Sequence, residues 1–169
     1  MENIVLELKE KSAIEQAIKF VERRFLETEQ AFYSKEDLLI AKKCLQSFDV
    51  MDVSQIEAQI KKKNVKVFVG LCDGKIYGVC ALDIPSGKIL FLATSEEDVK
   101  NTILREMIER MVEERAEEPD SRLNVMAFVG QEKTLASVGF RKLYDTVLFY
   151  RGVQLVPMKY SYTQFDIEK

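Results

Sequence analysis

A short apolar run that leads straight into an amphipathic helix limits the possible folds of this chain more than any other feature. Ile89–Ala93 lies between Ser86-Gly87 and a polar segment, and a run this short favours a strand buried on both faces over a helix. Apolar residues then return at the spacing of one helical stripe: Val99, Ile103, Leu104, Met107, Ile108, Met111 and Val112.

The start of this helix is the place where function should be sought first. A strand that feeds a helix directs the free amides of the helix at whatever lies beyond the strand end, and in many α/β proteins that is a phosphate. Ser95 with Asp98, or Thr94 with Glu97, has the spacing of a capping box. We therefore expect the helix to begin at Ser95 or one residue from it, with a Thr94 or Ser95 oxygen bonded to a nearby amide.

Length and composition indicate one domain over residues 1–169, because 169 residues of which 47% are hydrophobic can bury a proper core. No apolar stretch approaches the ~18 residues of a membrane span, and the N-terminus has neither a basic region nor an apolar run for export. We expect a cytoplasmic protein that does not bind membranes. The net charge of −3, with acids and bases mixed along the chain, gives no footprint for nucleic acid.

The chain contains no histidine, the residue that most often serves as a general base near neutral pH. A proton transfer would need a carboxylate, Tyr, Cys, Lys or water. Cys44, Cys72 and Cys80 lack the paired spacing of a zinc site or a disulfide framework. We expect three reduced, structural thiols and no metal.

The order of the remaining patterns predicts an α/β (α+β) fold with a mostly antiparallel central sheet of about seven strands and helices on both faces. Asp73-Gly74 divides Val65–Leu82 into the two arms of a hairpin. In this hairpin Val67 would lie opposite Cys80 and on the same face of the sheet, and Cys72 would lie on the other face. The other expected elements are a strand at Asn3–Leu8, helices at Ala13–Leu26 (box Ser12 and Glu15), after Ser34 and after Ser54 (box with Glu57), a strand at Leu123–Val129, a short helix ending at Gly139, and strands at Val147–Tyr150 and Val153–Val156.

Three segments, taken in their order, resemble the GNAT superfamily of acetyl-CoA-dependent N-acetyltransferases. Asp73–Gly78 looks like the hairpin between that family's second and third strands, Asn101–Glu106 like the body of its central helix, and Ala136–Arg141 like the end of its last helix. The resemblance covers Ile4 to about Val156 and leaves residues 157–169 as a C-terminal tail. It implies a GNAT-like mixed sheet and transfer of an acetyl group from acetyl-CoA to the amine of a small molecule or peptide.

The resemblance also implies where the cofactor would bind. In this family the pantetheine arm bonds to the backbone of the fourth strand, which here is Leu92, Ala93 and Thr94. Val99 and Lys100 fall on the loop that holds the diphosphate, and Lys100 could replace the Arg that the family carries there. The loop departs from the family because Ser95–Lys100 contains no glycine and places Glu96, Glu97 and Asp98 where the phosphates would lie.

The catalytic residues stay open. Leu135 stands where the family often has a Tyr that protonates the departing thiolate. Asp83, at the end of the third strand, and Tyr144 are candidates, although Asp83 is also typical of a turn before Pro85. The alternative function is a catalytically silent GNAT-fold module that binds a small molecule or a protein. The oligomeric state is equally open, with a homodimer among the alternatives.

Overall fold

The computed structural model describes residues 2–163. The strands are β1 (Asn3–Leu8), β2 (Val65–Cys72), β3 (Lys75–Asp83), β4 (Lys88–Thr94), β5 (Arg122–Phe128), β6 (Arg141–Lys142), β7 (Leu148–Tyr150) and β8 (Val153–Ser161). The helices are α1 (Lys11–Glu29), α2 (Lys35–Gln46), α3 (Val53–Lys61), α4 (Thr102–Glu114) and α5 (Glu132–Ser137), with single turns η1 (Asp49–Met51) and η2 (Val129–Gln131).

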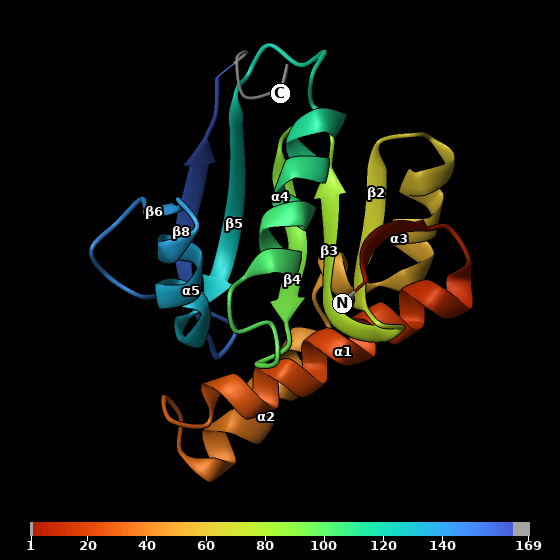
Figure 1. Ribbon diagram of the computed structural model, residues 1–169. Helices are drawn as coiled ribbons and strands as arrows, with labels where there is room; N and C mark the ends of the chain where they lie inside the picture. The colour runs from red at the N-terminus through yellow and green to blue at the C-terminus, as the bar shows by residue number, and fades with distance from the viewer. Residues whose placement is uncertain (1, 164–169) are drawn as a thin grey trace.

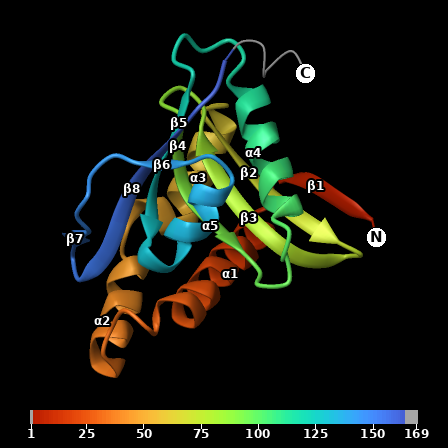
Figure 2. The same cartoon turned by 60° about the vertical axis from the view of Figure 1, so that its left-hand side comes forward.

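One sheet organises these elements in the order β1-β2-β3-β4-β5-β8-β6, and β7 pairs with β8 as well. Every pair of neighbours is antiparallel except β4 and β5, which are parallel. Helices α1, α2 and α3 cover one face, and α4 and α5 cover the other (Figure 1 and Figure 2). The predicted fold class is confirmed, and the sheet has eight strands within the described residues because the short β6 joins its edge.

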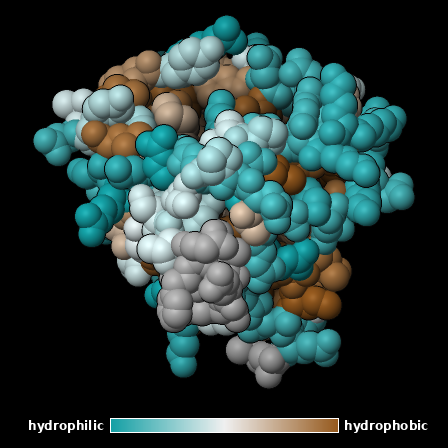
Figure 3. Space-filling model, turned by 90° about the horizontal axis from the view of Figure 1, so that it is seen from above, coloured by the Kyte–Doolittle hydropathy of each residue, from teal (hydrophilic) through white to brown (hydrophobic). Residues whose placement is uncertain are grey.

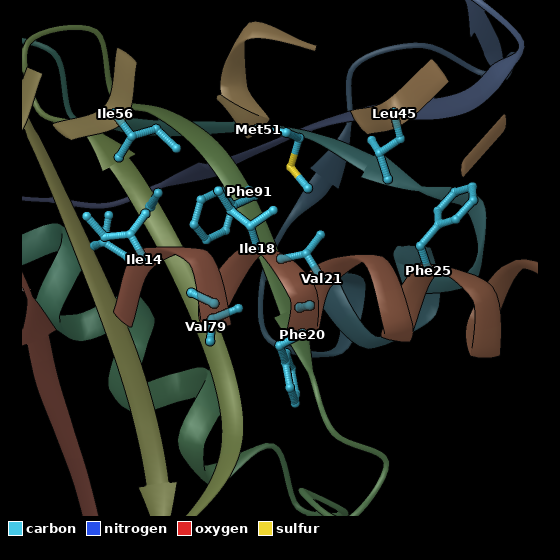
Figure 4. Packing of buried hydrophobic residues seen from close by; sticks show 14 of the residues in the cluster. Ile14, Ile18, Phe20, Val21, Phe25, Leu45, Met51, Ile56, Val79 and Phe91 are labelled. Atoms are coloured by element: carbon cyan, nitrogen blue, oxygen red, sulfur yellow. The ribbon is translucent and has the colours of Figure 1, made fainter. Parts of the chain in front are cut away.

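Each face of the sheet has its own hydrophobic core. On the first face α1 turns Ile14, Ile18, Val21 and Phe25 to the same side (Figure 4). They pack against strand residues such as Phe91 of β4. On the second face the stripe predicted for the central helix is buried from Ile103 to Val112. The periodicity of these two helices therefore determines which way each one faces.

The hairpin at Asp73-Gly74 forms as predicted, but its register slips by one residue after a few pairs. Gly70 lies opposite Gly78 while Leu71 lies opposite Ile76, so Tyr77 is an extra residue in a β-bulge. Cys80 consequently faces Phe68, and the predicted pairing with Val67 is wrong. Alternation along β2 then puts Cys72 on the same face as Phe68 and Cys80, whereas opposite faces were expected.

Helix starts were predicted correctly at one of three places. The Ser34 hydroxyl accepts from the Asp37 amide at 3.1 Å, as its spacing indicated. Helix α3 is capped by Asp52, which accepts from the Gln55 amide at 3.1 Å, and not by Ser54. Helix α1 begins at Lys11 after Glu10 without a side-chain cap. A capping-box spacing can thus occur inside a helix when an earlier residue already allows the chain to turn.

Strand β8 continues through Pro157, where the sequence predicted an end. It pairs with β5 from Leu155 opposite Phe128 to Ser161 opposite Arg122, so residues 157–161 of the expected tail belong to the sheet. Pro157 lacks only an amide, and its carbonyl still accepts from the Leu143 amide at 3.0 Å. The expected tail residues after 163 lie outside the described part of the chain.

Candidate active site

The parallel strands β4 and β5 pair at only two positions and then separate. Lys88 lies opposite Asn124 and Ile89 opposite Val125, and no pairing joins the later residues of the two strands within the described chain. The gap is a cleft of about 80 Å³ between Leu92, Ala93 and Thr94 of β4 and the turn after β5. Since the edge of β4 is not paired there, its backbone groups face the cleft.

The side chain of Gln131 spans this gap. Its Nε2 donates to the Leu92 carbonyl at 2.6 Å, and its Oε1 accepts from the Phe128 amide at 2.9 Å. On the other side of the cleft, Arg24 Nε donates to the Thr94 carbonyl at 2.7 Å. Two carbonyls of β4 are therefore bonded by side chains in place of a neighbouring strand.

A larger groove of about 860 Å³ adjoins the cleft and shares Val21, Leu92, Phe128 and Gln131 with it. Its walls come from η1, β4, β5 and the β7–β8 hairpin, and most of its lining is apolar. Among the described residues that line it, the charged ones are Asp49, Lys88 and Arg151. The groove and the cleft thus form one continuous depression with a polar wall at Gln131.

The loop between β4 and α4 folds on itself. The Ser95 hydroxyl accepts from the Glu97 amide at 3.1 Å, which agrees with the predicted local bond. The carboxylate of Asp98 reaches further and accepts from the Ile103 and Leu104 amides, each at 3.1 Å. Helix α4 accordingly begins at Thr102, and the predicted start at Ser95 is wrong, because Asp98 caps the helix from a loop rather than from its first turn.

The residues expected to bind a cofactor lie in two different environments. Leu92, Ala93 and Thr94 line the cleft together. Val99 is 82% exposed and precedes the helix, so it does not belong to the buried stripe in which its spacing had placed it. Lys100 is exposed next to it.

Neither of the two catalytic candidates lines the cleft or the groove. The Asp83 carboxylate accepts from the amide and the hydroxyl of Ser86 in the β3–β4 turn. Asp83 lies opposite Lys88 at the start of β4, whereas Thr94 is at the end of that strand. At ~3.3 Å per residue, the two ends of β4 are roughly 20 Å apart. These contacts are those of a turn residue. Tyr144 is 58% exposed, in the segment between β6 and β7.

Sequence reasoning missed Gln131, Arg24 and Glu29. A signal existed for two of them, because Arg24 and Glu29 continue the helical spacing of Val21 and Phe25 on α1. A charged residue on an apolar stripe indicates a buried partner. Gln131 carried no such signal, since its partners depend on how β4 and β5 meet.

Glu29 is fully buried at the end of α1. Its two carboxylate oxygens accept from the Gly130 amide at 3.1 and 3.0 Å, and the Thr28 hydroxyl donates to it at 2.8 Å. Burial raises the pKa of this carboxyl, while the hydrogen bonds from Gly130 and Thr28 act in the opposite direction. Glu29 therefore fixes the turn after β5, which carries Gln131, against α1.

Other kinds of site find no support between residues 2 and 163. No group of His, Cys, Asp and Glu could hold a metal ion there. Nor does that part of the chain have a helix with the length and apolar character needed to cross a bilayer. The surface seen from above is mostly hydrophilic, and its hydrophobic residues form separate patches (Figure 3).

A mixed sheet that opens between two parallel strands, with a helix starting at the open end, defines the N-acetyltransferase class that the sequence resembles. A family model described as an acetyltransferase (GNAT) domain matches residues 27–162. The chain belongs to the GNAT acetyltransferase family.

Solved structures support the fold. The PaiA N-acetyltransferase of Thermoplasma acidophilum, in complex with coenzyme A, aligns with a TM-score of 0.64 at 16% identity over 96% of this chain and 100% of that one. A GCN5-related N-acetyltransferase from Rhodopseudomonas palustris, also described as a class-II aminotransferase, aligns with a TM-score of 0.69 at 14% identity over 96% and 97%. No curated protein sequence matches the chain significantly.

Coenzyme A fits this site only in part. Within the described chain, this edge of β4 has no neighbouring strand beyond Ile89, and an extended chain such as the amide-containing pantetheine arm can bond to such an edge as a strand would. To do so, the arm has to replace the side chains of Gln131 and Arg24 on the Leu92 and Thr94 carbonyls. The start of α4 does not suit the diphosphate, because Asp98 already bonds two of its amides and brings a negative charge. The strand edge therefore favours binding of coenzyme A, whereas the helix start disfavours it.

Proposed function

We propose that this protein is an acyltransferase that moves an acetyl group from acetyl-CoA to an amine. The observation that carries the proposal is the continuity of the cleft at β4 with the large groove beside it, at Leu92, Phe128 and Gln131. An acceptor in the groove could reach a thioester held at the edge of β4. Family membership supports the reaction class, and the geometry adds two adjoining spaces for two reactants.

The residues of this chain have separate tasks in the proposed reaction. The backbone of Leu92, Ala93 and Thr94 would orient the arm of acetyl-CoA, which supplies the activated acyl group. Gln131, which lines both the cleft and the groove, would release the Leu92 carbonyl to the arm when the arm binds. The amine nitrogen would attack the thioester carbonyl, the C–S bond would break, and the sulfur would leave as a thiol after taking up a proton from water. The chain has no histidine, so the proton of the amine would pass to water in the groove, and Asp49 is the carboxylate that lines the groove among the described residues.

The acceptor that suits this groove is an amine with an apolar body. Aromatic and aliphatic side chains dominate the walls, including Phe48, Phe91 and Leu148. Lys88 and Arg151 outnumber Asp49 among the charged lining residues of the described chain, so a polycation would meet net repulsion there. We therefore expect arylalkylamines to be better acceptors than polyamines.

The test measures the release of the CoA thiol from acetyl-CoA in the presence of phenylethylamine or spermidine. We expect kcat/KM to be at least about tenfold higher for phenylethylamine, the equivalent of ~1.4 kcal/mol. Leu148→Glu should abolish this preference because it puts a charge into the groove. Leu39→Glu is the matched control, since Leu39 is 64% exposed on α2 and does not line the groove.

Two results would contradict the proposal in different ways. A higher rate with spermidine would refute the apolar acceptor while leaving acetyl transfer intact. The absence of thiol release with any amine at millimolar acetyl-CoA would refute the transfer itself, and the non-catalytic binding module would then be the better description.

A further inference from the structure

We infer that the start of α4 does not hold a diphosphate in this protein, because the chain's own Asp98 bonds two of the helix's first amides and brings a negative charge to the place where the diphosphate would lie. The inference uses family membership to say where the diphosphate is expected, and it does not depend on acetyl transfer. It predicts an internal carboxylate that competes with the cofactor and keeps its affinity low.

Amides at the start of α4 already have partners within the chain. An α-helix leaves its first amides without partners inside the helix, and these are what attracts an anion. In α4 the Ile103 and Leu104 amides donate to the two oxygens of Asp98, each at 3.1 Å. The next amide, that of Arg105, already donates to the Asn101 carbonyl at 2.9 Å. Two of the amides that a helix start normally leaves open, those of Ile103 and Leu104, are thus bonded by the chain itself.

The Asp98 carboxylate is also buried and charged. Asp98 is only 7% exposed, although it lies in a loop of otherwise accessible residues. A second anion at this position would have to share a partly dehydrated space with the carboxylate, and like charges at short range disfavour each other. A diphosphate could bind there only after the Asp98 carboxylate moves away from the Ile103 and Leu104 amides.

Hydrogen bonds hold the loop between β4 and α4 in this conformation. The Asp98 amide donates to the Ser95 carbonyl at 3.1 Å, and the Asn101 amide donates to the Asp98 carbonyl at 2.9 Å. Asn101 has a φ of 57°, in the left-handed region that Asn tolerates better than most residues. Its Nδ2 donates to the Ser137 hydroxyl of α5 at 3.2 Å. These contacts fix the carboxylate where it caps the helix.

The edge of β4 beside the cleft is also bonded by side chains of the chain itself. Arg24 and Gln131 bond the Thr94 and Leu92 carbonyls of β4, and only about 80 Å³ stays open between them. Both regions that the family offers to coenzyme A, the helix start and the strand edge, therefore carry intramolecular partners. Binding of the cofactor has to displace them.

The experiment measures the affinity of unacylated coenzyme A by calorimetry for the wild type, Asp98→Ala and Asp98→Asn. We expect Asp98→Ala to tighten binding about tenfold or more, because it frees two amides and removes the buried charge. Asp98→Asn, which keeps the size of the side chain, should show a smaller gain and serves if the Ala variant does not fold. Glu109→Ala is the matched control, since Glu109 is an exposed acid of α4 beyond its first turn and should change the affinity less than threefold.

Pantetheine, which lacks the diphosphate, separates this effect from a general opening of the cleft. Its affinity should change less than threefold in Asp98→Ala. Unchanged or weaker binding of coenzyme A by both Asp98 variants would overturn the inference, even if the wild type transfers acetyl groups. Tighter binding without any transfer would support the inference and count against the proposed function.

Discussion

The Cγ2 methyl group of Ile103 on α4 lies too close to the position of a Cβ atom on residue 70 for both to fit, so Gly70 on β2 lets the helix pack directly against the sheet. A second glycine, Gly78 on β3, lies beneath the same helix, and there the Cε atom of Met107 would be 2.7 Å from an added Cβ. The close approach brings the start of α4 near the end of β4. The position of the candidate site therefore depends on two residues without side chains.

Gly70→Ala should lower the free energy of unfolding by about 1–3 kcal/mol, because an overpacked core has to shift its neighbours. Gly78→Ala should cost less, since the tip of Met107 can move more easily than the branched carbon of Ile103. Urea denaturation of both variants tests this order. In the double variant Gly70→Ala/Ile103→Ala the two losses of unfolding free energy should not add. The shorter side chain at position 103 makes room for the methyl group added at position 70, and that methyl group fills part of the space that Ile103 leaves. Strict additivity would show that the two residues do not touch in solution.

Asp98→Ala should destabilise the fold while it improves cofactor binding. The loss of a helix cap costs roughly 0.5–2 kcal/mol, and the favourable interaction of the carboxylate with the helix dipole disappears too. Chemical denaturation of this variant and of Glu96→Ala gives the comparison. The Glu96 variant should stay within about 0.5 kcal/mol of the wild type, as exposed substitutions usually do. Equal losses in the two variants would argue against a capping role for Asp98.

Glu29 should make the protein less stable as the pH rises. Burial raises the pKa of this carboxyl above its ordinary value of 4.5, so the folded state binds more protons than the unfolded state in the window that begins near that value and extends upward. Stability attributable to Glu29 is therefore greatest at low pH and falls as the pH rises through this window.

The variant that tests this effect is Glu29→Gln, which is neutral at every pH. Its amide oxygen can accept from Gly130, and its NH2 group can donate to the Thr28 hydroxyl, whose single hydrogen can then turn from residue 29 to the Arg24 carbonyl 2.9 Å away. Unfolding free energies measured between pH 4.5 and 7 should fall less steeply in Glu29→Gln than in the wild type. Glu109→Gln, on the exposed side of α4, should keep the wild-type slope. Identical slopes in all three proteins would exclude Glu29 as the cause.

Cys80 should be the least reactive of the three thiols. It is fully buried, and burial raises its pKa to about 12, so almost none of it is thiolate at neutral pH. Cys72 is also buried, whereas Cys44 is half-buried on α2. Mass spectrometry after brief alkylation of the native protein should find label at Cys44 and at neither of the others. Label at Cys80 on the same time scale would show that the sheet opens far more readily than its packing indicates.

Much of the fold could be predicted because it depends on local patterns. The hairpin turn at Asp73-Gly74, the cap at Ser34 and the buried stripe from Ile103 to Val112 each follow from residues close together in the chain. The Asp-Gly pair suits a two-residue hairpin turn, and a stripe at 3.6 residues per turn suits a helix on a sheet. The order of the predicted elements, together with the segments Asp73–Gly78, Asn101–Glu106 and Ala136–Arg141, was enough to indicate the GNAT family.

Tertiary contacts decided the details that matter for the site. Because of the bulge at Tyr77, Cys80 pairs with Phe68 and not with Val67 as predicted. Asp98 left its local capping pattern because two amides five and six residues ahead were within reach of its carboxylate. Gln131 became part of the cleft only because β4 and β5 part after Ile89, which leaves a carbonyl and an amide that its side chain can bond. A residue's own neighbours in the chain set its conformational preference, but the partner that a buried polar group finally bonds depends on which segments the whole fold brings to it.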